Sequence, residues 1–372
     1  METTEYRPGL EGVVAAETRI SYLDVEHEEI VVRGYNLLDL INEKTYVDVL
    51  GLLIHERLPG DAERARLEQE LKAAQVPAAV WEILGKLPAS MHAMDRLRTA
   101  VSALAGFDPE ADSPDPERER AKGVRLVAQV ATIVANLTRV AQGQAPVLPD
   151  PQLGFAENFL YMITGRRPDA AEARAFDQAL IAYSEHEMPN STFTARVIAS
   201  TLSDVYGALT GAVASLKGPL HGGANEAVAH MLLEAGDVDG LERLIRDKLA
   251  RKERIMGFGH RVYMRKFDPR ALLLKQTLAR LVDERGDAEG KKWLAMCQRG
   301  EDVMREEKGL YPNLDYYAAP IYYVLGIPIE LYTPIFFAAR TAGLVAHVVE
   351  QHAQNRLYRP RVRYLGPRGL KA

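Results

Sequence analysis

The chain has 372 residues, of which 47% are hydrophobic and 26% are charged, a globular composition long enough for two domains. Its formal net charge of −5 offers no broad basic face, so we expect no nucleic-acid partner. The single cysteine, Cys297, excludes an internal disulfide, and we expect it to be a buried structural thiol in a reducing compartment.

The N-terminal sequence METTEYRPGLEG has no basic-then-apolar signal segment, so we expect a cytoplasmic protein. Two short β-type runs follow, TRISYLD and EEIVVRG, and the polar turn between them predicts a small hairpin. From there apolar residues recur at three- and four-residue spacing, which is typical of helices. The predicted helices include 46–56, 62–74, 94–105, 123–142 and 171–183. The chain is therefore predicted to be mainly α, with fifteen or more helices.

Proline marks the connections, and the acidic segment 106–119 is predicted to be a surface loop. From Tyr316 to Ala339 the only charged residue is Glu330, a length that could span a membrane. Three prolines in this stretch would break the helical hydrogen bonds where no water could replace them. We therefore predict a core segment and no membrane partner.

Segment 217–270 differs from its surroundings because it holds two glycine-rich turns, KGPLHGG and MGFGHRVYMRKFDPR, each with a histidine. Basic residues gather between and after these turns, in KLARKER and at Arg261, Arg265, Lys266 and Arg270. Glycines let a backbone approach a bulky ligand, and arginine and lysine suit phosphates. The pattern favours a phosphate-bearing ligand, and a solvated charged helix face is the alternative.

His221 lies in GPLHGGANEAV, directly before a predicted helix that Gly236 ends. The positive end of the helix dipole lowers the pKa of a histidine at that place. A neutral imidazole can donate one hydrogen bond to an enolate oxygen, although a structural role is the alternative for a lone histidine. His260 follows Gly257 and Gly259 and is a second histidine framed by glycines.

Asp315 follows a Pro-Asn turn in YPNLDYYAAP, where desolvation would raise its pKa toward that of a general base. The alternative is that Asp315 only caps the following helix. Arg340 projects from an apolar helix face and has no acid three or four residues away. A buried guanidinium needs a negative partner, so we expect a small anionic substrate or an acid from elsewhere in the fold. Arg270 and Arg359 could help it to clamp a dicarboxylate.

These motifs together resemble the citrate synthase family, of the shorter bacterial and archaeal type. GPLHGGANEAV, RIMGFGHRVY with DPR after it, YPNLD, TPIFFAAR and RLYRPRVRYLGP occur in the family's order and spacing. GLEGVVAAETRISYLD and RTAVSALAGFDPE match as well, so the resemblance covers nearly the whole chain.

The resemblance implies a nearly all-α homodimer in which each subunit has two domains. Residues 222–320 would form a small, mobile CoA-binding domain that closes over a large helical domain of residues 1–221 and 321–372. The implied reaction condenses acetyl-CoA, oxaloacetate and water to citrate and CoA, with no metal or redox cofactor.

By position, the resemblance makes Asp315 the base that takes a methyl proton from acetyl-CoA. His221 would bond the resulting enol or enolate, and His260 would polarise the ketone of oxaloacetate. The implied ligands of oxaloacetate are His186, Arg270, Arg340 and, from the partner subunit, Arg359. The implied CoA-binding residues are Gly257, Phe258, Gly259 and Arg265.

Two positions depart from the family pattern. Pro189 stands where the family usually has asparagine two residues before a serine, and Ala318 replaces a common serine after D-[FY]-Y. Both lie near the implied substrates, so these motifs do not determine which acyl-CoA is the donor. The closest alternative is 2-methylcitrate synthase, which uses propionyl-CoA, since one methylene changes discrimination by only about 1–3 kcal/mol.

Two further alternatives belong to other functional classes. A non-catalytic dimeric paralogue is disfavoured because both histidines and the aspartate are retained. A metal-dependent hydrolase would use His186, His221 and His260, but these lack a paired-ligand spacing such as H-E-x-x-H.

Overall fold

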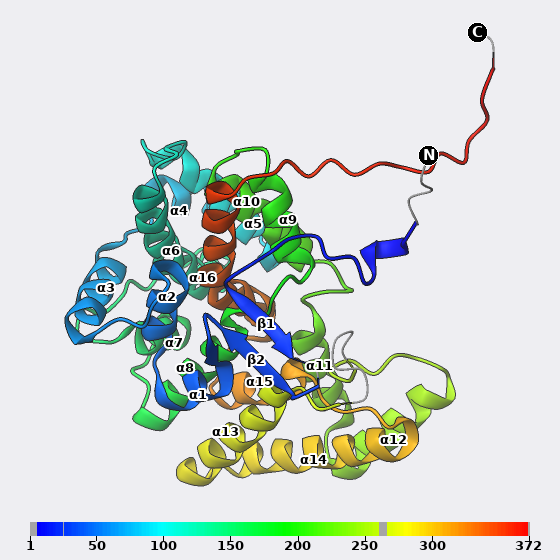
Figure 1. Ribbon diagram of the computed structural model, residues 1–372. Helices are drawn as coiled ribbons and strands as arrows, with labels where there is room; N and C mark the ends of the chain where they lie inside the picture. Colours follow the sequence, from blue (N-terminus) through cyan, green and yellow to red (C-terminus); the bar gives the residue numbers. More distant parts are fainter. Residues whose placement is uncertain (1–5, 25, 260–265, 371–372) are drawn as a thin grey trace.

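The computed structural model describes residues 6–24, 26–259 and 266–370 (Figure 1). Within these residues there are sixteen α-helices, three short 3-10 helices and one small antiparallel sheet near the N-terminus. This arrangement confirms the prediction of a mainly α protein with an N-terminal hairpin.

The sheet contains β1 (Ser21–Asp24), β2 (Glu29–Val32) and β3 (Tyr35–Asn36), in that spatial order. β1 and β2 form the predicted hairpin, with Ser21 paired to Val32. Buried and more exposed side chains alternate along both strands because successive residues point to opposite faces. β3 was not predicted, since two residues are too few to show an alternation.

The helices up to residue 216 are η1 (Pro8–Leu10), α1 (Leu37–Glu43), α2 (Tyr46–His55), α3 (Asp61–Ala73), α4 (Ala78–Lys86), α5 (Ala93–Leu104), η2 (Ala105–Phe107), α6 (Pro116–Ala141), α7 (Phe155–Thr164), α8 (Ala170–Ser184), α9 (Asn190–Ala199) and α10 (Val205–Leu216). Those that follow are α11 (Ala224–Ala235), α12 (Val238–Ala250), α13 (Pro269–Arg285), α14 (Ala288–Lys308), α15 (Leu314–Val324), η3 (Ile329–Leu331) and α16 (Tyr332–Ala353). Four of the five predicted helices match α2, α3, α5 and α8 to within one residue at each end.

The start of α6 is the clearest error of the predicted boundaries. The helix begins at Pro116, so the predicted loop 106–119 is too long and the predicted helix 123–142 starts too late. Asp115 caps the helix by accepting hydrogen bonds from the backbone N–H groups of Glu117 and Arg118. Proline at the first helical position is favourable because its N–H group would have no partner there.

α6 is also long and apolar enough to cross a membrane by composition alone. However, 78% of its most apolar window is buried inside the fold, where the helix contacts α16, α5 and α7. Burial on nearly all sides explains this composition, and it is typical of a core helix.

The apolar segment 316–339 is part of the core, as predicted. It contains most of α15, all of η3 and the first part of α16, whose residues are almost all buried. The prolines were expected to divide it, yet Pro320 lies inside α15. Pro334 falls in the first turn of α16, where a missing N–H group leaves no bond unmade. Packing around α15 therefore outweighs the helix-breaking tendency of Pro320.

Helices α11 to α15 pack on one another, with α12 against α14 and α13 against α15 (Figure 1). α13 and α15 also contact α8. Arg270 and Asp315, in the first turns of these two helices, bond to Ala182 and Tyr183, so both N-terminal ends lie beside the end of α8. Cys297 of α14 is fully buried, and burial raises the pKa of its thiol, which confirms the prediction of a buried thiol. After α16, residues 354–370 leave the body as an extended arm (Figure 1).

Candidate active site

Segments far apart in the sequence meet where α8 ends. The Tyr183 hydroxyl donates a hydrogen bond of 2.6 Å to Asp315 Oδ1, and Arg340 Nε donates one of 2.6 Å to the Tyr183 backbone oxygen. The ring of Phe336 lies 4.6 Å from that of Tyr183 and 6.4 Å from that of His221, measured between centroids. The structure thus brings together three predicted site residues, His221, Asp315 and Arg340.

Asp315 lies in the first turn of α15, and Asn313 is the cap of that helix. Asn313 Oδ1 accepts a hydrogen bond of 3.1 Å from the Asp315 backbone N–H, so the alternative that Asp315 is the cap is wrong. Burial raises the pKa of Asp315 to about 6, against the opposing hydrogen bond from Tyr183 and the charge of Arg270. Such a carboxyl group is ionised at pH 7 and is a stronger base than an exposed aspartate.

His221 lies shortly before the start of α11, as predicted, but its imidazole contacts the N-terminus of another helix. The backbone N–H of Ser191 donates to His221 Nε2 over 3.2 Å, and Ser191 Oγ lies 2.9 Å from the same atom. Ser191 belongs to the first turn of α9, whereas the prediction named the helix that follows His221, α11. Burial, assisted by the charge of Arg340, lowers the pKa of His221 to about 4.

His221 is therefore neutral at pH 7, as predicted. Because a backbone N–H group can only donate, Nε2 must be the accepting nitrogen and the single ring proton lies on Nδ1. The ring keeps one N–H donor on the nitrogen that Ser191 does not occupy. A fixed neutral donor of this kind can stabilise an enolate oxygen.

Arg340 is only 2% exposed, and its guanidinium lies 5.0 Å from the centre of the Phe336 ring. Its Nη1 atom is buried and has no hydrogen-bond partner among the described residues. Burial lowers the pKa of Arg340 to about 10, so the side chain is still a cation at neutral pH. A buried cationic donor without a partner is costly and is suited to an anionic ligand.

The alternative source of negative charge for Arg340, an acid elsewhere in the fold, is also present. Glu185 supplies the strongest negative charge that acts on Arg340. Its Oε1 atom is occupied, since it accepts a hydrogen bond from Ser21 Oγ over 2.8 Å and lies 3.1 Å from His347 Nε2. Glu185 thus offsets the charge of Arg340 while Nη1 stays available.

Arg270 is also buried, and its nearest acid is Asp268. Arg270 Nε and Nη2 donate to the two carboxylate oxygens of Asp268 over 3.0 and 2.8 Å. A third contact of 3.4 Å joins Nη1 to the backbone oxygen of Ala182, one residue before Tyr183. Arg270 therefore faces the same end of α8 as Arg340, held there by a bidentate ion pair.

Two other predicted ligands have different positions. His186 is buried at 6% exposure in the turn after α8 and directly follows Glu185. Arg359 lies exposed in the C-terminal arm, where its Nη1 donates to the Pro360 backbone oxygen over 2.8 Å. Within one chain the structure does not bring Arg359 to the other predicted ligands.

The predicted CoA-binding loop Gly257–Gly259 lies within the described residues, whereas the continuation of its sequence motif, residues 260–265, does not. Gly257 and Gly259 have φ angles of +85° and +74°, which side-chain-bearing residues rarely adopt. A Cβ atom on Gly257 would also lie 2.7 Å from a methyl carbon of Val228, so only glycine fits. His260 and Arg265 lie outside the described residues, and their predicted roles stay predictions.

The two departures from the family pattern lie at different depths. Pro189 caps α9, and the next residue, Asn190, has its side-chain oxygen bonded by Ser215 Oγ over 2.6 Å. The side-chain oxygen of Asn190 is thus bonded to α10. Ala318 is fully buried within α15.

Four residues of this site were not found from the sequence: Tyr183, Asp268, Glu185 and Phe336. Tyr183 ends the predicted helix 171–183 and lies three residues before His186, and this proximity in the sequence was the available signal. Asp268 stands in the DPR motif two residues before Arg270, and the two side chains form a bidentate pair across the proline between them. Nothing local to Glu185 or Phe336 indicates what they contact.

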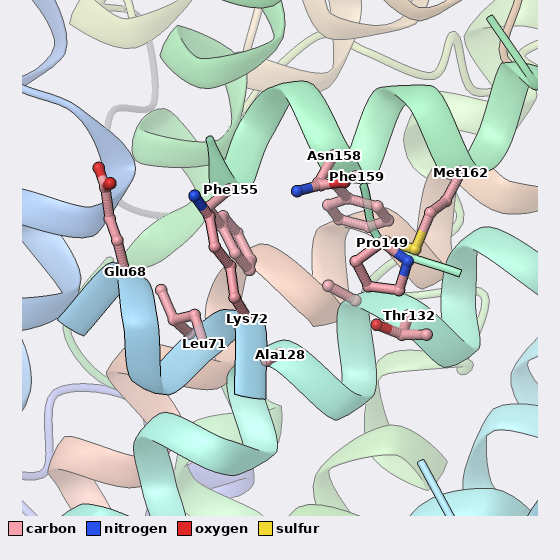
Figure 2. A pocket seen from close by; sticks show the side chains of 11 residues that line it. Glu68, Leu71, Lys72, Ala128, Thr132, Pro149, Phe155, Asn158, Phe159 and Met162 are labelled. Atoms are coloured by element: carbon pink, nitrogen blue, oxygen red, sulfur yellow. The ribbon is translucent and has the colours of Figure 1, made fainter. Parts of the chain in front are cut away.

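A small cavity of about 30 Å³ lies away from this site, between α3, α6 and α7 (Figure 2). Leu71, Phe155, Phe159 and Met162 line it, and its volume is suited to about one water molecule. In the part of the chain that the structure describes, no three His, Cys, Asp or Glu side chains are grouped so that they could hold a metal ion.

Comparisons with known proteins show similarity over nearly the whole chain. The family model described as "Citrate synthase, C-terminal domain" matches residues 9–361. The chain is 55% identical to a "Citrate/2-methylcitrate synthase" of Bacillus subtilis over 99% of this chain and 98% of that protein. It is 54% identical to a "Citrate synthase" of Heyndrickxia coagulans over 100% of this chain and 99% of that protein.

A solved structure gives the same result in three dimensions. The citrate synthase of Thermoplasma acidophilum, in a ternary complex with carboxymethyl coenzyme A and oxaloacetate, superposes with a TM-score of 0.92 and 32% identity. The match covers 100% of this chain and 98% of that one.

Proposed function

The chain belongs to the citrate synthase family, and we propose that it condenses acetyl-CoA with oxaloacetate and water to give citrate and free CoA. It is an acyltransferase of that family. The observation that supports this reaction best is that one site holds a carboxylate base with a raised pKa and a neutral histidine hydrogen-bond donor with a lowered pKa. The pKa of Asp315 is raised to about 6 and that of His221 is lowered to about 4. Asp315 accepts a hydrogen bond from Tyr183, whose ring packs on Phe336, and His221 lies on another side of Phe336 at 6.4 Å between ring centroids.

In the first step, the ionised Asp315 carboxylate takes a proton from the thioester methyl. The Nδ1–H group of His221 donates to the oxygen on which the enolate charge develops, which lowers the free energy of this unstable species. Arg340, Arg270 and His186 hold the carboxylates of oxaloacetate beside it. The buried, unpartnered Nη1 of Arg340 supports this role.

In the second step, the enolate carbon attacks the ketone carbon, and the new alkoxide takes a proton, for which we propose His260. Water then cleaves the C–S bond of citryl-CoA and releases citrate and CoA. We propose that residues 222–320 close over the large domain, because exclusion of water protects the thioester before condensation.

We further propose a cytoplasmic homodimer in which each Arg359 enters the partner's site. The C-terminal arm that carries Arg359 exposes apolar side chains, with Leu357, Val362 and Leu365 exposed at 61%, 89% and 83%. A second copy of the chain would cover these residues.

The second candidate is 2-methylcitrate synthesis from propionyl-CoA, which is favoured by the double name of the B. subtilis relative. We expect oxaloacetate-dependent release of free thiol with acetyl-CoA and propionyl-CoA measured in parallel. A clear preference for acetyl-CoA supports the main proposal, and a preference for propionyl-CoA supports the second. No release with either donor would refute both. Dialysis against a chelator should leave the rate unchanged, because we propose no metal.

The Tyr183 hydroxyl provides a pH-dependent test of the base. Since Asp315 acts as a carboxylate, kcat should rise as pH increases through its pKa of about 6. The hydrogen bond from Tyr183 stabilises that carboxylate, so Tyr183→Phe should move the rising limb about one unit higher, as expected for a lost bond to a charged group. The rate should fall most near pH 6 and least near pH 8.

Tyr332→Phe is the matched control, because the Tyr332 hydroxyl is buried and has no hydrogen-bond partner among the described residues. Its pH profile should match that of the unmodified enzyme. A rising limb that stays in place in Tyr183→Phe would contradict the assignment of Asp315 as the titrating base.

A further inference from the structure

Asn313 contacts both the predicted CoA-binding loop and the peptide group of the proposed base. Its backbone N–H donates to the Gly257 oxygen over 2.9 Å, and its side-chain Nδ2 donates to the Gly259 oxygen over 3.1 Å. Its Oδ1 atom accepts from the Asp315 N–H over 3.1 Å. One amide side chain therefore uses its donor on the loop and its acceptor on α15.

The loop is fixed to the same segment by further contacts. The Gly259 N–H donates to the Tyr311 oxygen over 3.1 Å, and Phe258 forms an isolated β-bridge with Pro312. The buried Phe258 ring lies 4.4 Å from the ring of Tyr316, the residue after Asp315. A displacement of the loop would therefore be transmitted to the start of α15.

The first turn of α15 is anchored from a second side. Asp268 Oδ2 accepts a hydrogen bond of 3.2 Å from the Leu314 N–H, and the same carboxylate holds Arg270. The backbone N–H of Leu314 thus bonds to another segment, whereas that of Asp315 bonds to Asn313, the cap of its own helix. The Asp268 segment carries Arg270, a proposed oxaloacetate ligand, and the Asn313 side chain also bonds to the proposed CoA loop.

We propose that Asn313 is a positioning residue. When acyl-CoA binds to the Gly257–Gly259 loop, the hydrogen bonds of Asn313 fix the position of the Asp315 backbone relative to that loop. The carboxylate is aimed at the thioester methyl when the loop holds the cofactor portion of the substrate. A misplacement of about 1 Å at a reacting group can cost about 10²-fold in rate, so one hydrogen bond at this position has a measurable effect. This inference rests on the proposed function.

Asn313→Ser separates the two bonds of the side chain. Serine caps a helix about as well as asparagine, so the bond to the Asp315 N–H is kept, while the donor to Gly259 is lost. We expect kcat to fall about 5- to 10-fold and the KM for acyl-CoA to rise several-fold, the scale of one lost hydrogen bond. The KM for oxaloacetate and the rising pH limb should not change. Asn313→Ala also removes the cap and should lower kcat about another 5-fold.

Asn36→Ser is the control, because Asn36 also caps a helix with its side-chain oxygen and donates a hydrogen bond from its side-chain nitrogen. Its Oδ1 accepts from the Leu38 N–H over 2.8 Å, and its Nδ2 donates to Glu29 Oε1 over 3.2 Å. This variant should lose a similar amount of thermal stability and keep unmodified kinetics.

Two outcomes would overturn the inference. One is unmodified kinetics in Asn313→Ser, and the other is an equal loss of kcat/KM for both substrates that follows the loss of stability. Inactivity of the unmodified chain with both acyl donors would instead refute the proposed function, so the two failures are distinguishable.

Discussion

Asp315→Asn should lower kcat for thiol release by about 10²- to 10⁴-fold, the range contributed by a positioned general base. Asparagine has nearly the same shape, and its side-chain oxygen can still accept the hydrogen bond from Tyr183. Burial disfavours the charged form of Asp315, so its loss should not destabilise the fold. The measurement is kcat at saturating substrates near pH 8, together with the melting temperature.

Asp302→Asn is a suitable control for the loss of one negative charge, because Asp302 lies on α14 in a surface pair with Arg305. It should leave kcat unchanged. Turnover of Asp315→Asn close to that of the unmodified enzyme would exclude Asp315 as the base, whatever the acyl donor.

Arg340→Met should raise the KM for oxaloacetate by about 10²- to 10³-fold, the scale of removing one partner of a buried charge pair. The guanidinium is buried and its Nη1 atom has no partner among the described residues, which supports the proposed role as a ligand of the substrate carboxylate. Methionine fills a similar volume beside Phe336, and Glu185 keeps its contacts with Ser21 and His347. We therefore expect a folded protein.

A binding measurement separates this effect from catalysis. Oxaloacetate alone should raise the melting temperature of the unmodified protein, since a ligand that binds only the folded state stabilises it, and this shift should vanish in Arg340→Met. Arg340→Lys keeps the charge but not the planar fork and should give an intermediate KM. Arg305→Met, on the surface of α14, should change neither quantity. An unchanged KM in Arg340→Met would contradict the assignment.

The candidate site also shows why the contacts of a site residue were harder to predict from the sequence than the residue itself. His221 and Asp315 stand out locally because glycine-rich and Pro-Asn turns flank them. Their pKa shifts come from groups distant in the chain, namely burial by packed helices, Arg340 beside His221, and Tyr183 and Arg270 beside Asp315. The direction of each shift was predicted, for Asp315 from desolvation and for His221 from the helix dipole, but burial is the larger cause at His221 as well. The helix that faces His221 was not predicted.

The sequence by itself determined the mainly α class, the hairpin and most helix boundaries, because helical periodicity and capping depend on residues a few positions apart. It also determined the family, through motifs that are continuous in the chain. Only the tertiary structure decided that Tyr183 holds Asp315, that α9 contacts His221, that Asn313 joins the Gly257–Gly259 loop to α15, and that Pro320 remains within a helix. These pairings join distant segments, and they depend on how whole helices pack, which no short stretch of sequence encodes.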